Sequence, residues 1–287
     1  MSSAPRAIHH LNCGTMCPRG ARLLTGAGGL LASTRLVCHC LLIEGADGLV
    51  LIDTGFGSDD VRKPAQLGAI FNALVRPQPD ASETAVERIR ALGFEPADVR
   101  HIVTTHLDLD HAGGLPDFPD ADVHLLGVEL DAALSPGWRE RQRYIAAHWS
   151  HGPSWVRHGV EGERWLGFDS VRALPDSDEE ILLIPLPGHT AGHTGVAVRQ
   201  GDGWLLHCGD AYFRQSEVQT PPRCPPGLRL FELVNEVDGA ARRANQERLR
   251  ELGERHGAEV ELICSHDPHP LERHQRAASV AAAAGES

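Results

Sequence analysis

Hydrophobic and polar positions follow one another along the chain in a pattern that predicts short strands and helices in alternation. Two apolar runs, residues 37–44 and 49–53, are separated by a polar turn that contains glycine, and together they predict a β-hairpin. Residues 80–92 predict a helix, because Asp80 precedes Glu83 by three residues as in a capping box and apolar residues follow at helical spacing. The buried face of this helix would consist of Val86, Ile89 and Leu92.

Four short apolar runs end directly in loops that are rich in histidine and aspartate. The runs are residues 101–105, 181–186, 204–207 and 260–264. Each has the length and composition of a buried strand. Side chains at the ends of neighbouring strands meet at one edge of a sheet, where ligand sites usually form. The pattern therefore predicts an α/β fold whose functional residues gather at a single sheet edge.

The stretch from residue 138 to residue 165 differs from the rest because it holds four of the five tryptophans. Trp138, Ile145 and Trp149 fall at positions i, i+7 and i+11, which would place them on one face of a helix. Two interpretations remain open. The segment could be a helix packed on the body of the protein, or a cap that lines a substrate pocket. In either case residues 135–170 are interpreted as an aromatic-rich insertion or cap.

The charge of the chain restricts its partners. The 287 residues carry a formal net charge of −12, from 27 basic and 39 acidic residues. Such a protein lacks the basic field that nucleic acids require and would be repelled by anionic membranes, so we expect neither as a partner. No apolar run reaches the ~18 residues that span a bilayer, and the N-terminus lacks an apolar signal region. We expect a cytoplasmic protein that acts on a small molecule.

The length and the cysteine count of the chain predict a single globular domain without a disulfide framework. Hydrophobic residues make up 41% of it, which is enough for a buried core, and we expect one domain over residues 1–287 with a disordered tail or frayed helix at about 277–287. The seven cysteines are odd in number, which argues against a disulfide framework and favours reduced thiols. Association as a homodimer is left open.

The densest group of potential metal ligands lies just after the first of the four apolar runs. The candidates there are His106, Asp108, Asp110 and His111, and single candidates follow the other three runs at His189, Asp210 and His266. Four such side chains within six residues, at the end of an apolar strand, are hard to explain as solvated surface. Imidazole nitrogens and carboxylate oxygens are the ligands that zinc, iron and manganese take in proteins.

The order and spacing of these residues resemble the metallo-β-lactamase superfamily. The resemblance begins at residues 51–55, LIDTG, and ends at His266, so it covers most of the chain. It implies an α/β fold of the four-layer αβ/βα sandwich type, in which two β-sheets face each other and helices lie outside. It also implies a metal site at one edge of the sandwich.

The resemblance further implies a role for each candidate. His106 and His189 would bind a first divalent metal ion that Asp108 would also face; Asp110, His111 and His266 would bind a second, and Asp210 would bridge the two. Asp53 would orient the site without binding metal. Three other histidines would not be ligands: His193 would support its loop, His207 would pack in the core and His269 would face solvent.

Asp108 is the departure from the family's pattern. The usual motif is H-x-H-x-D-H and this chain has H-x-D-x-D-H, so a carboxylate replaces a neutral imidazole. The net charge of two divalent cations together with their ligands is then one unit less positive than usual, which weakens the acidification of bound water. Carboxylates also favour harder metals, so iron and manganese are alternatives to zinc, and incomplete occupancy of the first site stays open.

The resemblance implies a hydrolase in which two divalent metal ions, taken first as zinc, hold a hydroxide that attacks a substrate carbonyl. Asp110 would take up a proton as the intermediate collapses. The lactonases of the family fit best, because they share the chain's length, its SHD-type final motif and a tyrosine shortly after the bridging aspartate. Tyr212 would be that tyrosine and would contact the substrate carbonyl, and packing beside Phe213 is its alternative role. The predicted substrate is a lactone or a related ester.

Other functions remain as alternatives. Flavodiiron proteins share the fold and carry H-x-E-x-D-H, so the chain could be a di-iron reductase of oxygen or nitric oxide, although the 21 residues after His266 are too few for a flavodoxin module. Hydrolysis of another bond, in a thioester, a β-lactam or an organophosphate, is a second alternative. A non-catalytic descendant is disfavoured by the otherwise complete ligand set, and a nuclease is disfavoured by the net charge.

Overall fold

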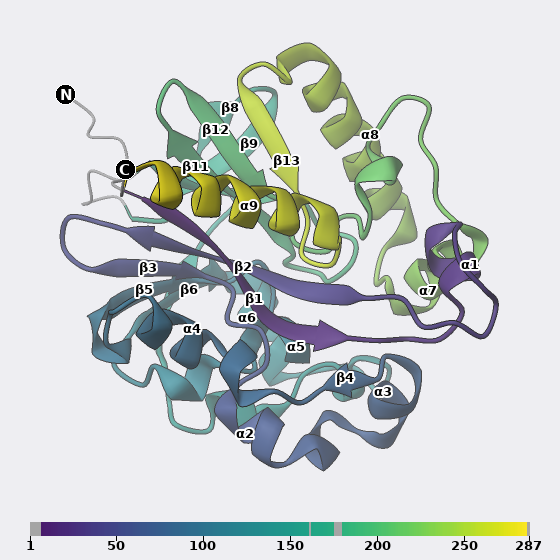
Figure 1. Ribbon diagram of the computed structural model, residues 1–287, viewed down its shortest axis with the longest axis horizontal. Coiled ribbons are helices and arrows are strands. Elements are labelled where there is room, and N and C mark those ends of the chain that lie inside the picture. Colours follow the sequence, from purple (N-terminus) through teal and green to yellow (C-terminus); the bar gives the residue numbers. More distant parts are fainter. Residues whose placement is uncertain (1–6, 161, 175–179, 286–287) are drawn as a thin grey trace.

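The computed structural model of the protein describes residues 7–160, 162–174 and 180–285, and these form two β-sheets (Figure 1). The strands of the first sheet are β1 (Ile8–Met16), β2 (Leu36–Glu44), β3 (Leu49–Ile52), β4 (Pro77–Gln78), β5 (Val99–Val103), β6 (Asp122–Leu126) and β7 (Ser154–His158). Those of the second are β8 (Glu163–Trp165), β9 (Phe168–Arg172), β10 (Ile181–Pro185), β11 (Thr194–Gln200), β12 (Gly203–His207) and β13 (Val260–Ile263). Their orders in space are β4-β1-β2-β3-β5-β6-β7 and β13-β12-β11-β10-β9-β8.

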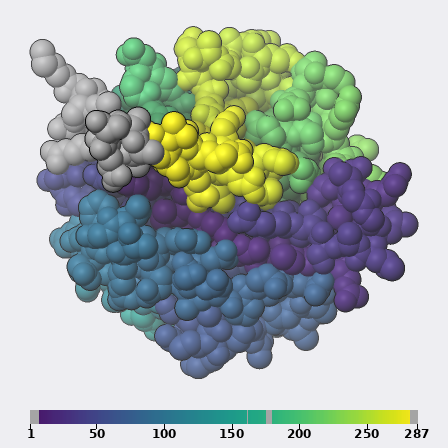
Figure 2. Space-filling view, viewed as in Figure 1, coloured from purple at the N-terminus to yellow at the C-terminus, as the bar shows by residue number. Residues whose placement is uncertain are grey.

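Helices cover the outer faces of both sheets. The helices of the described ranges are α1 (Ala21–Thr25), α2 (Ser58–Arg62), α3 (Ala69–Leu74), α4 (Ala85–Ala91), α5 (Leu109–Ala112), α6 (Gly127–Leu134), α7 (Pro226–Asn235), α8 (Gly239–His256) and α9 (Pro268–Gly285). Helices α4, α5 and α6 pack on the first sheet and α8 packs on the second. In Figure 2 the purple N-terminal strands form a band between the yellow α9 and the blue residues that follow the hairpin. Within the described ranges, every helix is too short or too polar to cross a membrane.

Alternation of side chains along the strands creates three apolar layers. In β2, Leu41 and Ile43 point toward the second sheet and share one buried cluster with Leu183 and Val196. Leu42 of the same strand points the other way and belongs to the cluster beneath the helices of the first sheet. A third cluster lies between the second sheet and α8. Three apolar layers between helix, sheet, sheet and helix make the four-layer αβ/βα sandwich that the sequence motifs implied.

The predicted hairpin and the four predicted strands are present, with bounds that differ by one or two residues. The predicted helix at 80–92 is instead divided. Asp80 accepts a hydrogen bond from the Ser82 backbone and starts only a short 3₁₀ turn, and α4 begins after Thr84. Val86 and Ile89 are buried as expected, but Leu92 follows the helix and is 40% exposed.

The aromatic segment after residue 137 is not a helix, so that prediction is wrong. It contains two short 3₁₀ turns and then supplies β7 and β8, which are end strands of the two sheets. Trp138 is 81% exposed, while Trp149 packs against the core of the first sheet. At the other end of the chain, α9 continues to Gly285, so residues 277–285 of the predicted tail are helical, and residues 286–287 lie outside the described residues.

Three histidines on β5, β6 and β7 form a hydrogen-bonded row across the first sheet. The His124 ring lies between the other two, 3.1 Å from the His101 ring and 3.1 Å from the His158 ring, measured between nitrogens. Burial lowers the pKa of His124 to about 4, and the His101 and His158 rings add to this effect, whereas Asp122 and the Ala173 backbone oppose it. The folded protein therefore keeps His124 neutral at a pH where the unfolded chain protonates it.

We expect this histidine to limit stability in acid. Because its pKa is lower in the folded than in the unfolded state, its stabilising contribution is present above about pH 6.5 and is lost as the pH falls toward 4. Between pH 7 and pH 4.5, the free energy of unfolding measured in urea should fall by about 1–3 kcal/mol less for His124→Gln than for the parent protein. The exposed His269→Gln serves as control. Equal acid loss in the parent protein and His124→Gln would contradict this expectation.

Candidate metal centre

The candidate ligands come from strand ends of both sheets. The segment after β5 in the first sheet carries four of them, two in the loop and two in α5, and the loops after β10, β12 and β13 in the second sheet carry one each. The prediction of convergence at one edge of one sheet is therefore corrected: the side chains meet where the two facing sheets share an edge. All of them are buried except Asp110, whose side chain is 12% exposed.

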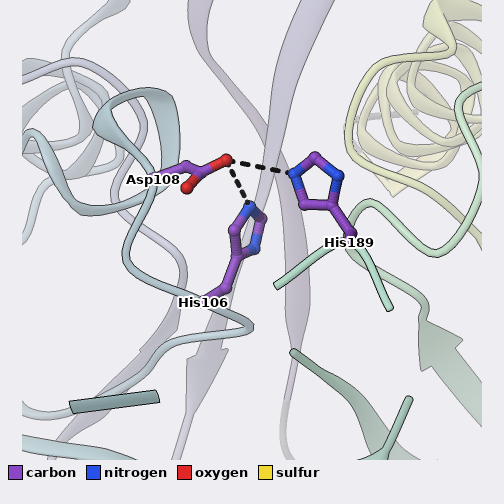
Figure 3. Close-up of side chains that lie close together, drawn as sticks. All are labelled: His106, Asp108 and His189. Atoms are coloured by element: carbon purple, nitrogen blue, oxygen red, sulfur yellow. Dashed lines mark hydrogen bonds and ion pairs between the residues drawn. The ribbon is translucent and has the colours of Figure 1, made fainter. Parts of the chain in front are cut away.

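His106, Asp108 and His189 form the first group of ligand atoms (Figure 3). The Asp108 carboxylate points between the two imidazoles, with its Oδ2 atom 3.4 Å from His106 Nε2 and 3.0 Å from His189 Nε2. Both residues of the H-x-D pair face the same point because they lie two residues apart on an extended loop. A small cation between these three atoms would contact one oxygen and two nitrogens.

Asp110, His111 and His266 form the second group. His266 Nε2 lies 3.6 Å from the Oδ2 atom of Asp110. The other ring nitrogen of His266, Nδ1, donates a hydrogen bond to the Val37 carbonyl oxygen at 2.8 Å and so fixes the orientation of the ring. Nε2 is consequently the nitrogen that carries a free lone pair toward the site.

Asp210 lies between the two groups. Its Oδ2 atom is 3.5 Å from His189 Nε2 and 4.0 Å from His106 Nε2 on one side. Its Oδ1 atom is 3.4 Å from His111 Nε2 and 3.1 Å from His266 Nε2 on the other. Oδ2 also lies 3.2 Å from His266 Nε2, so it faces histidines of both groups. The carboxylate as a whole lies between the two groups, as is required of a ligand shared by two cations.

Asp53 fixes the orientation of the first loop. Its carboxylate accepts hydrogen bonds from the backbone and hydroxyl of Thr105, at 2.7 and 2.8 Å, and lies 2.8 Å from His111 Nδ1. His111 is thereby left with Nε2 directed at Asp210. Asp53 has a left-handed backbone with φ of 53°, an uncommon conformation for a residue other than glycine. It touches the ligands without facing the space between them, as the resemblance implied.

The ligand atoms are electrostatically coupled. Burial opposes a charge on His111, but the carboxylates of Asp210 and Asp53 outweigh it and raise its pKa well above the usual value. Burial likewise opposes a charge on Asp210, and His266 and His111 hold its pKa well below the usual range. The carboxylate is thus favoured in its anionic form, and protons compete with cations for His111.

Several buried ligand atoms lack a hydrogen-bond partner within the described part of the chain. They are His106 Nε2, His111 Nε2 and Asp210 Oδ1. A buried polar atom without a partner is costly in a folded protein and calls for a specific explanation. All three face the space between the candidate ligands, and nitrogen and carboxylate donors suit divalent transition metals. The residues present therefore fit two divalent cations.

The three histidines expected not to be ligands are placed as predicted. His193 lies 3.0 Å from the Leu186 carbonyl through Nδ1, and its Nε2 accepts the Asp210 backbone N–H at 2.9 Å, so it holds the bridging residue's turn. His207 is buried and bonded to the His39 carbonyl, and His269 is exposed. Tyr212 is fully buried in the second-sheet core, and its hydroxyl donates to Gln215 at 3.2 Å. A contact between Tyr212 and substrate stays a prediction.

Glu129 is a buried carboxylate of α6 that the sequence analysis did not identify. It accepts hydrogen bonds from the Leu107 backbone at 3.0 Å and the Tyr144 hydroxyl at 3.1 Å. Its other oxygen accepts from the Thr190 hydroxyl at 2.7 Å and the Gly192 backbone at 3.1 Å. Glu129 therefore ties the loop of the first motif to the loop that carries His189.

Arg143 is the second residue that sequence reasoning missed. It lies in the irregular segment between two 3₁₀ turns, and its guanidinium contacts both Asp108 and His189. The segment had been considered as a possible cap, and through Arg143 one part of it does reach the candidate ligands. A single arginine among the 26 of the chain carries no local pattern that would distinguish it.

Comparison with known proteins identifies the family. A family model described as the metallo-beta-lactamase superfamily matches residues 33–255. The chain belongs to the metallo-beta-lactamase superfamily. The match confirms the resemblance drawn from the motifs and covers six of the seven candidate ligands. Only His266 lies beyond the matched residues.

Relatives within the metallo-beta-lactamase superfamily include hydrolases. A probable metallo-hydrolase of Mycobacterium tuberculosis is 43% identical over 265 residues, which are 92% of this chain and 81% of that protein. The N-acyl homoserine lactonase AttM of Rhizobium johnstonii is 30% identical over 230 residues, 79% of this chain and 80% of that protein. These similarities support a metallo-hydrolase.

Solved structures of the superfamily share the fold. An N-acyl homoserine lactone hydrolase with the product N-hexanoyl-L-homoserine at its catalytic metal centre has a TM-score of 0.70. The match has 20% identity and covers 94% of this chain and 97% of that one. AidC, a dizinc quorum-quenching lactonase, has a TM-score of 0.59 at 17% identity, with 92% and 88% of the two chains covered. At these identities the similarity establishes the sandwich fold alone.

Proposed function

We propose that the protein hydrolyses a lactone or a related carboxylic ester with the help of two divalent cations. The observation that carries the proposal is the convergence of seven buried or nearly buried candidate ligands, with the Asp210 carboxylate 3.5 Å from His189 Nε2 in one group and 3.1 Å from His266 Nε2 in the other. The 30% identity with the lactonase AttM supports a lactone as the ester class.

The cations would be held by residues whose donor atoms already face one another. His106, Asp108 and His189 would hold the first, Asp110, His111 and His266 the second, and Asp210 both. Four imidazoles in this set favour zinc over harder metals, so we propose zinc. Cations bound there would acidify a water molecule and polarise the substrate carbonyl.

The chain's own residues position and transfer protons in this scheme. Asp53 and the Val37 carbonyl fix the rings of His111 and His266 so that Nε2 of each faces the site. Asp110 has the most exposed carboxylate of the three aspartate ligands, at 12% against 10% for Asp108 and 5% for Asp210. We assign to Asp110 the role of accepting the proton of the attacking water or hydroxide and passing it to the leaving alkoxide oxygen as the ester C–O bond breaks.

Replacement of Asp110 tests this assignment. Asp110→Asn keeps an oxygen that can face the second site but removes the basic group, so we expect kcat for lactone opening to fall by at least ~10²-fold. The assay uses a panel of N-acyl homoserine lactones, a simple aryl ester, a thioester, a β-lactam and a phosphotriester, with metal content measured for each sample.

The control for this test is Asp120→Asn, which changes an exposed aspartate further along the same region of the chain. Hydrolysis by Asp110→Asn at a near-normal rate would remove Asp110 from the mechanism. If the parent protein with its full complement of metal opens none of the lactones or esters but cleaves another member of the panel, the proposed substrate class is wrong.

A further inference from the structure

The guanidinium of Arg143 forms a two-point ion pair with the residue that departs from the family motif. Its Nε donates to Asp108 Oδ1 and its Nη2 donates to Asp108 Oδ2, both at 2.6 Å. Such fork-to-fork pairing is the strongest geometry available to an arginine and a carboxylate. Both partners are shielded from solvent, since the side chains are 15% and 10% exposed. Both oxygens of Asp108 are therefore engaged by the same cationic group.

The arginine is also anchored away from Asp108. Its Nη1 donates to the carbonyl oxygen of His189 at 3.1 Å and to that of Asn235, at the end of α7, at 2.9 Å. These two backbone acceptors lie outside both groups of ligand atoms. They hold the guanidinium at the edge of the first site independently of the carboxylate it pairs with.

A third contact brings the guanidinium to a ligand nitrogen. Nη2 lies 2.8 Å from His189 Nε2, the atom that also faces Asp108 and Asp210. A guanidinium nitrogen carries only donor hydrogens, so Nη2 donates to this nitrogen and the His189 Nε2 lone pair is the acceptor. An N–H donor and a metal ion cannot share the single lone pair of one imidazole nitrogen.

Arg143 also changes the charge that the first site presents. Counted from the sequence alone, Asp108 lowers the net charge of the two metal ions and their ligands by one relative to the usual set. The paired guanidinium cancels that carboxylate, so the site regains the balance that a neutral histidine would provide.

We propose that Arg143 is a resident counter-ion that makes the first site bind its cation more weakly than the second. The inference rests on the metal site of the proposed function. Two effects act in the same direction. The guanidinium competes for the lone pair of His189 Nε2, and its positive charge repels the metal ion of the first site, which would lie only a few ångströms away. Arg143 is thus a positioning residue that sets how fully the first site is occupied.

The second site lacks such a competitor. Among the hydrogen bonds and ion pairs of the described ranges, none joins an arginine or lysine to Asp110, His111 or His266. Two cations should therefore bind with clearly different affinities, and the second site should fill first.

The ion pair determines what should happen when the usual family motif is restored by Asp108→His. Asp108→His alone would leave the guanidinium buried beside two imidazoles and without its carboxylate, an unpaired cation that repels a metal ion. This single variant should bind the first cation no more tightly than the parent protein. Only Asp108→His combined with Arg143→Met should give two tight sites.

The test is a zinc titration in competition with a chromophoric chelator, which yields both dissociation constants without any substrate. We expect Arg143→Met to tighten the weaker constant by at least about tenfold and to leave the tighter one unchanged. The control is Arg141→Met, which removes an exposed arginine two residues earlier on the same segment. Arg143→Gln keeps one donor for Asp108, removes the charge and should have the same effect.

An unchanged or weakened first-site constant in a folded Arg143 variant would overturn the inference, with thermal unfolding used to establish folding. If neither variant folds, Asp108→His in the parent background decides, because two equally tight zinc ions there would also overturn it. These constants are independent of turnover. A protein that opens no lactone yet gains first-site affinity would therefore contradict the proposed substrate and support the role of Arg143.

Discussion

Asp210→Ala is expected to lower kcat for lactone opening by at least ~10²-fold and to reduce bound metal below two ions per chain. The reason is geometric, since this carboxylate lies between the two groups and its oxygens are 3.1 to 4.0 Å from imidazole nitrogens of both. Loss of the side chain would remove a ligand from both cations at once. Steady-state kinetics and elemental analysis of the same purified sample measure the two effects.

Asp202→Ala is the matched control for this variant. Asp202 is exposed at the turn between β11 and β12, the strand that leads to Asp210, so its removal disturbs the same hairpin without touching the site. The control should retain normal rate and metal content. Retention of two ions and near-normal turnover by Asp210→Ala would show that Asp210 does not bridge them.

Glu129→Ala should give the largest loss of stability among substitutions outside the ligand set. Four donors point at this fully buried carboxylate, and removing it leaves the backbone N–H groups of Leu107 and Gly192 without a partner. Each unsatisfied buried donor costs about 1–3 kcal/mol, so we expect the free energy of unfolding to fall by about 3–5 kcal/mol. Urea unfolding of chelator-treated protein measures this loss apart from metal binding.

Tyr144→Phe provides a graded comparison, because it removes only one of the four hydrogen bonds to Glu129. It should cost about 1 kcal/mol and leave metal content intact. Glu129→Ala should in addition weaken zinc binding at the first site, since the carboxylate joins the loops of His106 and His189. Equal stability of Glu129→Ala and Tyr144→Phe would contradict the role assigned to Glu129.

The convergence of the candidate ligands was predictable because each of them follows a short apolar run in the chain. A short apolar run followed at once by histidine or aspartate identifies a strand end, and strand ends of this fold meet at one place. The same reasoning located Asp53 at the end of the hairpin. The division of helix 80–92 was missed because Asp80 and Thr84 are both acceptable caps, and the backbone uses Asp80 only for a 3₁₀ turn.

Arg143 and Glu129 could not be predicted in this way. Arg143 contacts residues 35, 46 and 92 positions away, and Glu129 joins residues 15 to 63 positions distant. Such roles depend on how loops approach one another after folding, which local pattern does not encode. The charge deficit attributed to Asp108 was incomplete for the same reason, because its counter-ion comes from a segment whose irregular backbone gave no periodic signal.

The central claim is that seven side chains bind two divalent cations that the protein needs to open a lactone. The most direct measurement is a zinc titration of chelator-treated protein in which bound zinc and hydrolysis of an N-acyl homoserine lactone are followed together. We expect no hydrolysis without metal and a rate that rises until two ions are bound per chain. Full activity in the metal-free protein, or two bound zinc ions with no lactone opened, would contradict it.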